Sequence, residues 1–253
     1  MNRSIYMRAI LATTALIIAS LGFAATASAT VPGKNGPILL NSFFGFSTQS
    51  PKTVVSQVTP KGKITPVLKR NGLVGLPAIS PNGNRIVYQG IPGYQLYTSV
   101  LSKPNKALRI TNAPKTTIPS QGVFAADGKS VYFSTTTAGT GGTYKSVLKQ
   151  YFFATRKTKI HQLKTTGGQG LVMTDVSANG RIALFTDMLA PTPEVYVGNL
   201  VTGALRVLTT KLATIQGSLS PDGKRIAYSG YDKTSWDVFV SDLSGKLLKH
   251  VTK

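Results

Sequence analysis

The chain has 253 residues, with 29 Lys or Arg, eight Asp or Glu, two His and no Cys. Without cysteine it can form neither disulfides nor thiolate metal sites, so a packed core must supply the stability of its fold. The formal charge of +21 at pH 7 favours polyanionic partners: cell-wall phosphates, acidic glycans, anionic lipid surfaces or nucleic acid.

The first 29 residues have the three parts of a secretory signal peptide. Met1–Arg8 carries two positive charges and no acid, Ala9–Ala25 is an apolar run, and Ala27-Ser28-Ala29 fits the pattern of a cleavage site. The alternative is a membrane anchor, because the apolar run approaches spanning length. The cleavage triplet favours a signal peptide over residues 1–29, and the absence of cysteine excludes a lipid anchor.

The predicted mature chain, residues 30–253, carries 27 cations (29 minus two signal-peptide arginines) and eight acids. It contains no further run of the ~18 apolar residues that a membrane helix needs. We therefore expect a soluble protein that is secreted or periplasmic. Its length suits one large all-β domain or two small ones.

One turn motif recurs along the mature chain. Its copies are Ser80-Pro81-Asn82-Gly83, Ala125-Ala126-Asp127-Gly128, Ser177-Ala178-Asn179-Gly180 and Ser220-Pro221-Asp222-Gly223, and Lys34-Asn35-Gly36 keeps the end of it. The glycines lie 47, 45, 52 and 43 residues apart. A period of this length is typical of propeller blades.

Each repeat predicts four short strands. An apolar run follows the glycine directly, at residues 38–40, 86–88, 131–133, 182–185 and 226–228. After a variable loop comes an alternating strand, clearest at residues 195–200 and 238–243. A last strand ends in an aliphatic residue and threonine, at Ile110-Thr111, Leu208-Thr209 and Val251-Thr252. A further strand leads to the next turn motif, which gives the four strands of a blade.

The turn motif and the runs that follow it have a physical explanation. Proline presets φ, Asn or Asp bonds back to the backbone, and glycine takes the left-handed conformation that closes a tight hairpin. The runs are apolar on both faces, as expected of a blade packed between two neighbours. A β-sandwich would also have short strands, but it does not explain the recurring motif. We therefore predict an all-β protein, a propeller of four-stranded antiparallel blades.

Residues 220–228 (Ser-Pro-Asp-Gly-Lys-Arg-Ile-Ala-Tyr), 237–240 and 250–252 resemble the WD40-like (PD40) repeat of the exported bacterial TolB propellers. The resemblance covers residues 32–253 and implies the fold but not an activity, because related blades occur in protein-binding propellers, prolyl-peptidase-type hydrolases and sugar-acid lyases. TolB propellers usually have six blades, whereas five repeats are present here and the first lacks its opening strand. The separate amino-terminal domain of TolB is also missing. The sequence leaves open whether the ring has five or six blades and how it closes.

Candidates for catalysis are few, and we expect no catalytic, cofactor-binding or metal-binding residues. His161 and His250 each accompany the last strand of a repeat, where we interpret them as solvated strand residues. No Gly-x-Ser-x-Gly elbow occurs, and two isolated histidines without cysteine do not make a usual zinc site. The cluster Gly139, Gly141 and Gly142 lacks the lysine and helix of a phosphate loop, so we expect an enlarged loop.

The acids also point to structural roles. They are Asp127, Asp175, Asp187, Glu194, Asp222, Asp232, Asp237 and Asp242. Asp127 and Asp222 belong to turn motifs. Glu194 and Asp237 occupy the same place in successive repeats, which suggests a structural role. Asp232, Asp237 and Asp242 recur every five residues, for which a calcium site is the weaker alternative.

Cations and aromatic residues occupy different turns of the predicted blades. The first and third turns of a blade, which emerge at one end of a propeller, hold Arg85, Lys129, Arg181, Lys224, Arg225, Lys61, Lys63, Lys103, Lys106, Arg156, Lys157, Lys159 and Lys246. Aromatic residues near the second turns are Phe44, Phe46, Tyr94, Tyr144, Tyr231 and Trp236. We therefore predict one basic end and one neutral, aromatic-rich end. The simpler explanation of the lysines is that they protect outer strands and keep the protein soluble.

These observations favour an exported, non-catalytic propeller that binds a protein, a peptide or an anionic envelope polymer. Peripheral contact with a membrane is compatible with the charge. The alternatives are a propeller-fold enzyme, such as a sugar-acid lyase or hydrolase, and a structural surface protein acting through weak multivalent contacts. Nucleic acid is not an expected partner, because the protein is exported and its aromatics are not interleaved with its cations. The sequence specifies neither the ligand nor the oligomeric state.

Overall fold

The computed structural model describes residues 38–44, 51–59, 61–91, 93–164, 170–210 and 212–252. The predicted signal peptide, residues 1–29, and the first copy of the turn motif lie outside the described residues. A single turn of 3-10 helix, η1 (Thr140–Gly142), is the only helix in the described part of the chain. No helix there is long or apolar enough to cross a membrane.

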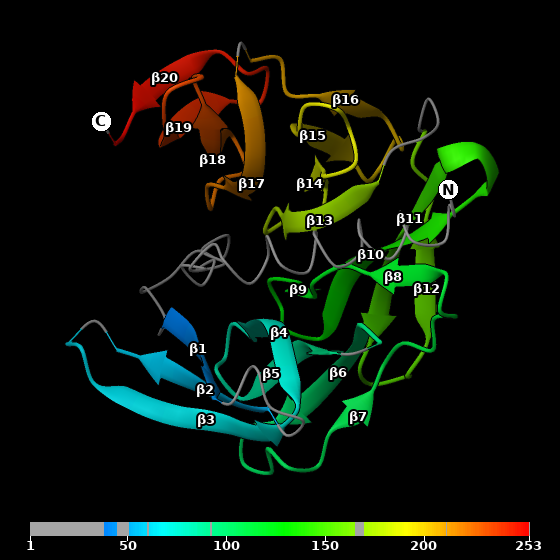
Figure 1. Cartoon of the computed structure of the whole chain (residues 1–253), viewed down its shortest axis with the longest axis vertical. Helices are drawn as coiled ribbons and strands as arrows, with labels where there is room; N and C mark the ends of the chain where they lie inside the picture. The colour runs from blue at the N-terminus through cyan, green and yellow to red at the C-terminus, as the bar shows by residue number, and fades with distance from the viewer. Residues whose placement is uncertain are drawn as a thin grey trace, which may run out of the picture.

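The described strands form five antiparallel sheets, which stand around a common centre as the blades of a propeller (Figure 1). Blade 1 consists of β1 (Ile38–Phe44), β2 (Lys52–Val58) and β3 (Ile64–Asn71). Blade 2 consists of β4 (Leu73–Ile79), β5 (Arg85–Ile91), β6 (Gln95–Val100) and β7 (Leu108–Arg109). Blade 3 consists of β8 (Thr117–Pro119), β9 (Val123–Phe124), β10 (Ser130–Ala138), β11 (Tyr144–Phe152) and β12 (Thr158–His161).

Blade 4 consists of β13 (Leu171–Val176), β14 (Ile182–Asp187), β15 (Glu194–Asn199) and β16 (Leu205–Val207). Blade 5 consists of β17 (Ala213–Leu219), β18 (Arg225–Tyr231), β19 (Trp236–Asp242) and β20 (Leu247–His250). The predicted all-β propeller with five repeats is therefore confirmed. The first blade has three described strands, and the residues that the structure describes include no opening strand for it, as expected. In blade 3 the innermost position is divided between β8 and β9, which both pair with β10.

The recurring turn motif forms the same hydrogen bonds wherever it contains serine. Ser80 donates its hydroxyl to Asn82 Oδ1 at 2.8 Å and accepts the backbone N–H of Arg85 at 2.9 Å. The copies at residues 177–182 and 220–225 repeat both bonds. The glycine of each turn has a positive φ, +71° at Gly83, which a residue with a Cβ adopts only under strain. The motif thus fixes the hairpin between the first two strands of a blade.

The apolar residues fill layers between neighbouring blades. Ile86 and Tyr88 of β5 pack with Leu39 of blade 1, whereas Val87, between them, packs with Phe124 of blade 3. Successive residues of a strand point to opposite faces, so both faces of this run are buried, as its composition predicts. Similar layers of buried residues join blade 3 to blade 4 and blade 4 to blade 5. Among the described residues no such layer joins blade 5 to blade 1.

A buried carboxylate also links blade 4 to blade 5. Asp175 in β13 has 1% of its surface exposed. Its Oδ2 accepts the backbone N–H of Leu219 at 2.8 Å and the hydroxyl of Ser218 at 3.0 Å, both in β17, while Oδ1 accepts the N–H of Val176 at 2.8 Å. A buried charge is costly unless hydrogen bonds satisfy it. Asp175 therefore links β13, the innermost strand of blade 4, to β17, the innermost strand of blade 5.

Candidate functional site

The two histidines lie in the last strands of different blades. The Nε2 atom of His161 in β12 lies 3.0 Å from Gln150 Oε1, and the imidazole ring contacts the ring of Tyr132. His250 in β20 is 3.4 Å from Asp237 Oδ2, and its ring stacks on Phe239 with 4.3 Å between centroids. Because blades 3 and 5 hold them separately, these residues do not form a common site. Both histidines contact neighbours within their own blade.

The acids of the turn motifs and Asp237 accept hydrogen bonds from their own turns and strands. Asp127 and Asp222 accept the N–H of the residue two positions later, as the turn motif predicts. Asp237 accepts the hydroxyls of Ser235 and Thr252, which agrees with a structural role.

The remaining spaced aspartates also hold their own turns. Asp232 accepts bonds from Thr234 and Ser235, which lower its pKa to about 2. Asp242 accepts two bonds from Ser244 in the same way. In the part of the chain that the structure describes, no three His, Cys, Asp or Glu are grouped as metal ligands.

The glycine cluster forms the loop between β10 and β11. Gly141 and Gly142 both have positive φ, and Gly139 closes the loop with an N–H bond of 2.8 Å to the carbonyl of Thr143. The loop is an enlarged hairpin connection, as predicted.

A small cavity lies beside the innermost strands of three blades. A cavity of about 20 Å³ lies between the innermost strands of blades 2, 3 and 4. The described residues around it are Leu76, Pro77, Ala78, Gln121, Gly122, Val123 and Thr174. These lining residues include no acid, His, Lys or Arg.

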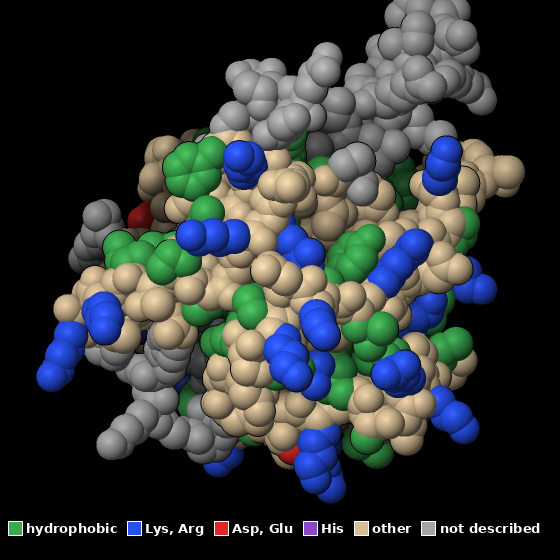
Figure 2. Space-filling model, turned by 90° about the horizontal axis from the view of Figure 1, so that it is seen from below, with side chains coloured by type: hydrophobic (Ala, Val, Ile, Leu, Met, Phe, Trp, Pro, Cys, Tyr) green, Lys and Arg blue, Asp and Glu red, His purple; other side chains and the backbone are tan. Residues whose placement is uncertain are grey.

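Blades 1 and 2 differ from the other blades because no acid opposes their positive charge. Residues 38–109 contain no Asp or Glu, and their nine cations are Lys52, Lys61, Lys63, Lys69, Arg70, Arg85, Lys103, Lys106 and Arg109. Figure 2 shows the side of the molecule on which β3 and β7 lie: Lys and Arg side chains spread over it, with very little Asp or Glu between them. The cations of these two blades therefore have no carboxylate partner within their own blades.

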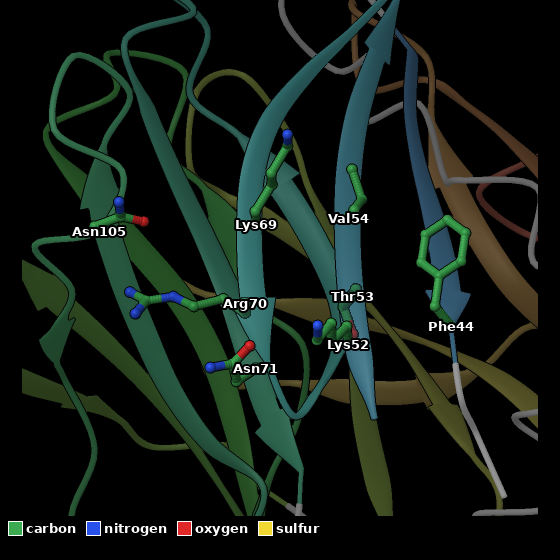
Figure 3. A pocket seen from close by; sticks show the side chains of 8 residues that line it. All are labelled: Phe44, Lys52, Thr53, Val54, Lys69, Arg70, Asn71 and Asn105. Atoms are coloured by element: carbon green, nitrogen blue, oxygen red, sulfur yellow. The ribbon is translucent and has the colours of Figure 1, made fainter. Parts of the chain in front are cut away.

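A groove of about 420 Å³ opens among these cations. Its described lining residues are Phe44, Lys52, Thr53, Val54, Lys69, Arg70, Asn71 and Asn105 (Figure 3). The first seven come from the end of β1, the start of β2 and the end of β3. Asn105 belongs to the loop between β6 and β7 of blade 2. The end of β3 comes close to this loop, because β3 runs across the molecule toward blade 2 (Figure 1).

Strand register sets which side chains share a face of blade 1. Lys52 is paired with Phe44 on one side and with Asn71 on the other, and Val54 is paired with Lys69. Paired residues lie on the same face of a sheet, and alternate residues along a strand share it. Phe44, Lys52 and Lys69 therefore project from one face, the one turned away from blade 2.

Arg70 projects from the opposite face and is fixed between the blades. It donates from Nη2 to the carbonyl of Pro104 at 3.4 Å, and its guanidinium carbon lies 5.7 Å from the centre of the Tyr88 ring. Its buried Nε has no acceptor among the described residues. Burial raises the pKa of Tyr88, an effect that the charge of Arg70 partly offsets. The phenol stays neutral at physiological pH, so it does not cancel the charge of Arg70.

The groove corrects the predicted division into a basic and a neutral end. First and third turns do lie together, since Leu101 donates its N–H to Asn84 and Phe153 donates to Lys129. At blade 1, however, Phe44 shares a groove with Lys52 and Lys69, so aromatic and cationic groups meet. Lys52 and Lys69 are 17 residues apart, and only the pairing of β2 with β3 joins them. The hairpin turn at residues 59–63 was the one sequence signal for that pairing. Phe46 lies outside the described residues.

Solved structures of TolB share this architecture. TolB from Acinetobacter baumannii superposes with a TM-score of 0.63 at 22% identity, over 83% of this chain and 50% of that one. The fold is TolB-like. A putative TolB from Agrobacterium tumefaciens gives a TM-score of 0.58 at 14% identity, over 79% and 76% of the two chains. This TolB-like propeller thus spans half the length of the Acinetobacter protein.

The same fold also serves an enzyme. An oligogalacturonate lyase from Vibrio parahaemolyticus superposes with a TM-score of 0.56 at 11% identity, over 76% of this chain and 55% of that one. No protein-family model and no curated protein matches the sequence of the TolB-like propeller. At these identities the likeness concerns the fold, and function has to be argued from the site.

Proposed function

We propose that this chain is an exported, non-catalytic binding protein that attaches to an anionic polymer of the cell envelope. A protein or peptide is the other class of partner that a propeller accommodates. The observation that carries the proposal is the charge of blades 1 and 2, which hold nine cations and no acid. Such a field attracts polyanions and raises their local concentration at the surface.

The absence of a described catalytic group supports a binding role. His161 and His250 are in different blades, and the exposed acids are held by bonds of their own turns and strands. The cavity of about 20 Å³ between the innermost strands of blades 2, 3 and 4 is smaller than the ~300 Å³ typical of ligand pockets. The groove on blade 1, in contrast, is open and lined by cations.

The proposal is tested by measuring binding to alginate, polyphosphate, anionic lipid vesicles and neutral dextran. The salt concentration is raised from about 0.1 M to about 1 M, because the screening length then falls from about 10 Å to about 3 Å. We expect affinity for a polyanion to fall at least ~10-fold and dextran to bind at neither salt concentration. A salt-independent affinity would refute electrostatic attachment, and release of unsaturated sugar products from alginate would refute a non-catalytic role.

A further inference from the structure

We infer that the groove on blade 1 binds a carboxylate-bearing sugar unit of an acidic glycan, with Lys52 and Lys69 at the carboxylate and Phe44 against the sugar ring. This inference rests on the proposed function and assigns a site and a ligand class to it. The site lies on the outer part of a terminal blade, away from the centre of the propeller.

The exposed aromatic ring points to a sugar. Phe44 has 56% of its surface exposed and lines the groove together with Val54. Figure 3 shows the ring at the end of β1, which lies beside the β2 strand that carries Lys52. A sugar ring has an apolar face of C–H groups that can cover such a phenyl group, and removal of both surfaces from water is favourable. A phosphate chain has no such face and would leave the ring exposed.

The polar groups of the groove match the rest of such a unit. Lys52 and Lys69 are exposed and project from the face that carries Phe44. Asn71 is exposed too and shares this face through its pairing with Lys52, and an amide can both donate to and accept from hydroxyl groups. A carboxylate and several hydroxyls on one ring would use both kinds of partner at once.

Arg70 contributes a fixed charge rather than a flexible one. Its guanidinium is held by the carbonyl of Pro104 and the ring of Tyr88. No acid within residues 38–109 opposes it. The guanidinium therefore adds a fixed positive charge beside the groove, on the opposite face of the sheet from the two lysines.

Calorimetric titration with a short mannuronate oligosaccharide and with polyphosphate tests the inference. Phe44→Ala is expected to lower affinity for the oligosaccharide about 10-fold and to leave polyphosphate binding unchanged. Phe44→Tyr, which keeps the ring, should retain oligosaccharide affinity. Lys69→Ala should weaken both ligands about 10-fold. Lys145→Ala removes another exposed strand lysine, in blade 3, and should change either affinity less than about twofold.

The outcomes separate the site from the general function. If the oligosaccharide binds in a salt-dependent way but Phe44→Ala and Lys69→Ala both behave like Lys145→Ala, the groove is not the site and the proposed function stands. If Lys69→Ala weakens both ligands and Phe44→Ala weakens neither, the groove is a general anion site and the sugar assignment is wrong. If the unaltered chain binds no polyanion, the proposed function itself fails. Circular dichroism of each variant verifies the fold, which exposed substitutions should preserve.

Discussion

Replacement of Asp175 by Ala tests the link between blades 4 and 5. The substitution removes the acceptor for the N–H of Val176, the N–H of Leu219 and the hydroxyl of Ser218. A buried donor left without an acceptor costs about 1–3 kcal/mol. With two backbone donors affected, and a small cavity added, we expect the free energy of unfolding to fall by about 3–5 kcal/mol.

Urea unfolding of the protein, followed by circular dichroism, measures this loss. Asp175→Asn should have a smaller effect, because its amide retains one oxygen that can accept. The matched control is Asp127→Ala, which removes an exposed carboxylate that accepts one turn bond in blade 3. Its expected cost is about 1 kcal/mol or less. If Asp175→Ala and Asp127→Ala destabilise the protein equally, the buried carboxylate does not hold the blades together.

Three further predictions concern the core, a turn and pH. Phe185→Ala should lower the free energy of unfolding by about 3–5 kcal/mol, because Phe185 is fully buried between blades 3 and 4. Thermal and urea unfolding measure this loss of stability. Gly245→Ala should be destabilising, because φ is +96° and a Cβ would collide with the backbone carbonyl of Thr209. The control is Gly62→Ala, with φ of +78° and open space around it, which should lower the free energy of unfolding by only about 1 kcal/mol. Equal losses in the two variants would contradict the collision. Burial, and then the charge of Lys159, lowers the pKa of His161, so the folded state binds a proton less readily than the unfolded state. The stability contributed by neutral His161 is therefore complete above about pH 6.5 and declines as the pH falls toward the folded pKa. His161→Gln should flatten this part of the stability curve, and an unchanged slope between about pH 7 and pH 5 would exclude His161 as its source.

Local features of the sequence predicted the fold well. The turn motif could be recognised because its hydrogen bonds join residues within five positions, as in Ser80 and Arg85. The apolar runs were equally informative, since Ile86 and Val87 are buried on opposite faces by two different blades. Both signals act over short distances and recur, so a single chain contains several independent copies of them.

The features that the sequence did not reveal depend on distant partners. Asp175 was recognised only as one of eight acids, because its acceptor role requires Leu219, 44 residues away in the next blade. The groove depends on the register of β2 and β3 and on the tilt of β3 toward blade 2. Composition describes neither register nor tilt. The expected separation of aromatic from basic residues failed at blade 1 for this reason.

Each described blade is assembled from strands that are consecutive in the chain, and none combines strands from the two halves of the protein. Within the described residues, the blades meet through the layers of side chains between neighbours. Blade 1, which carries the cationic groove, could therefore separate from blade 2 without unthreading any other described sheet. Occupation of that groove would stabilise blade 1 against such local opening.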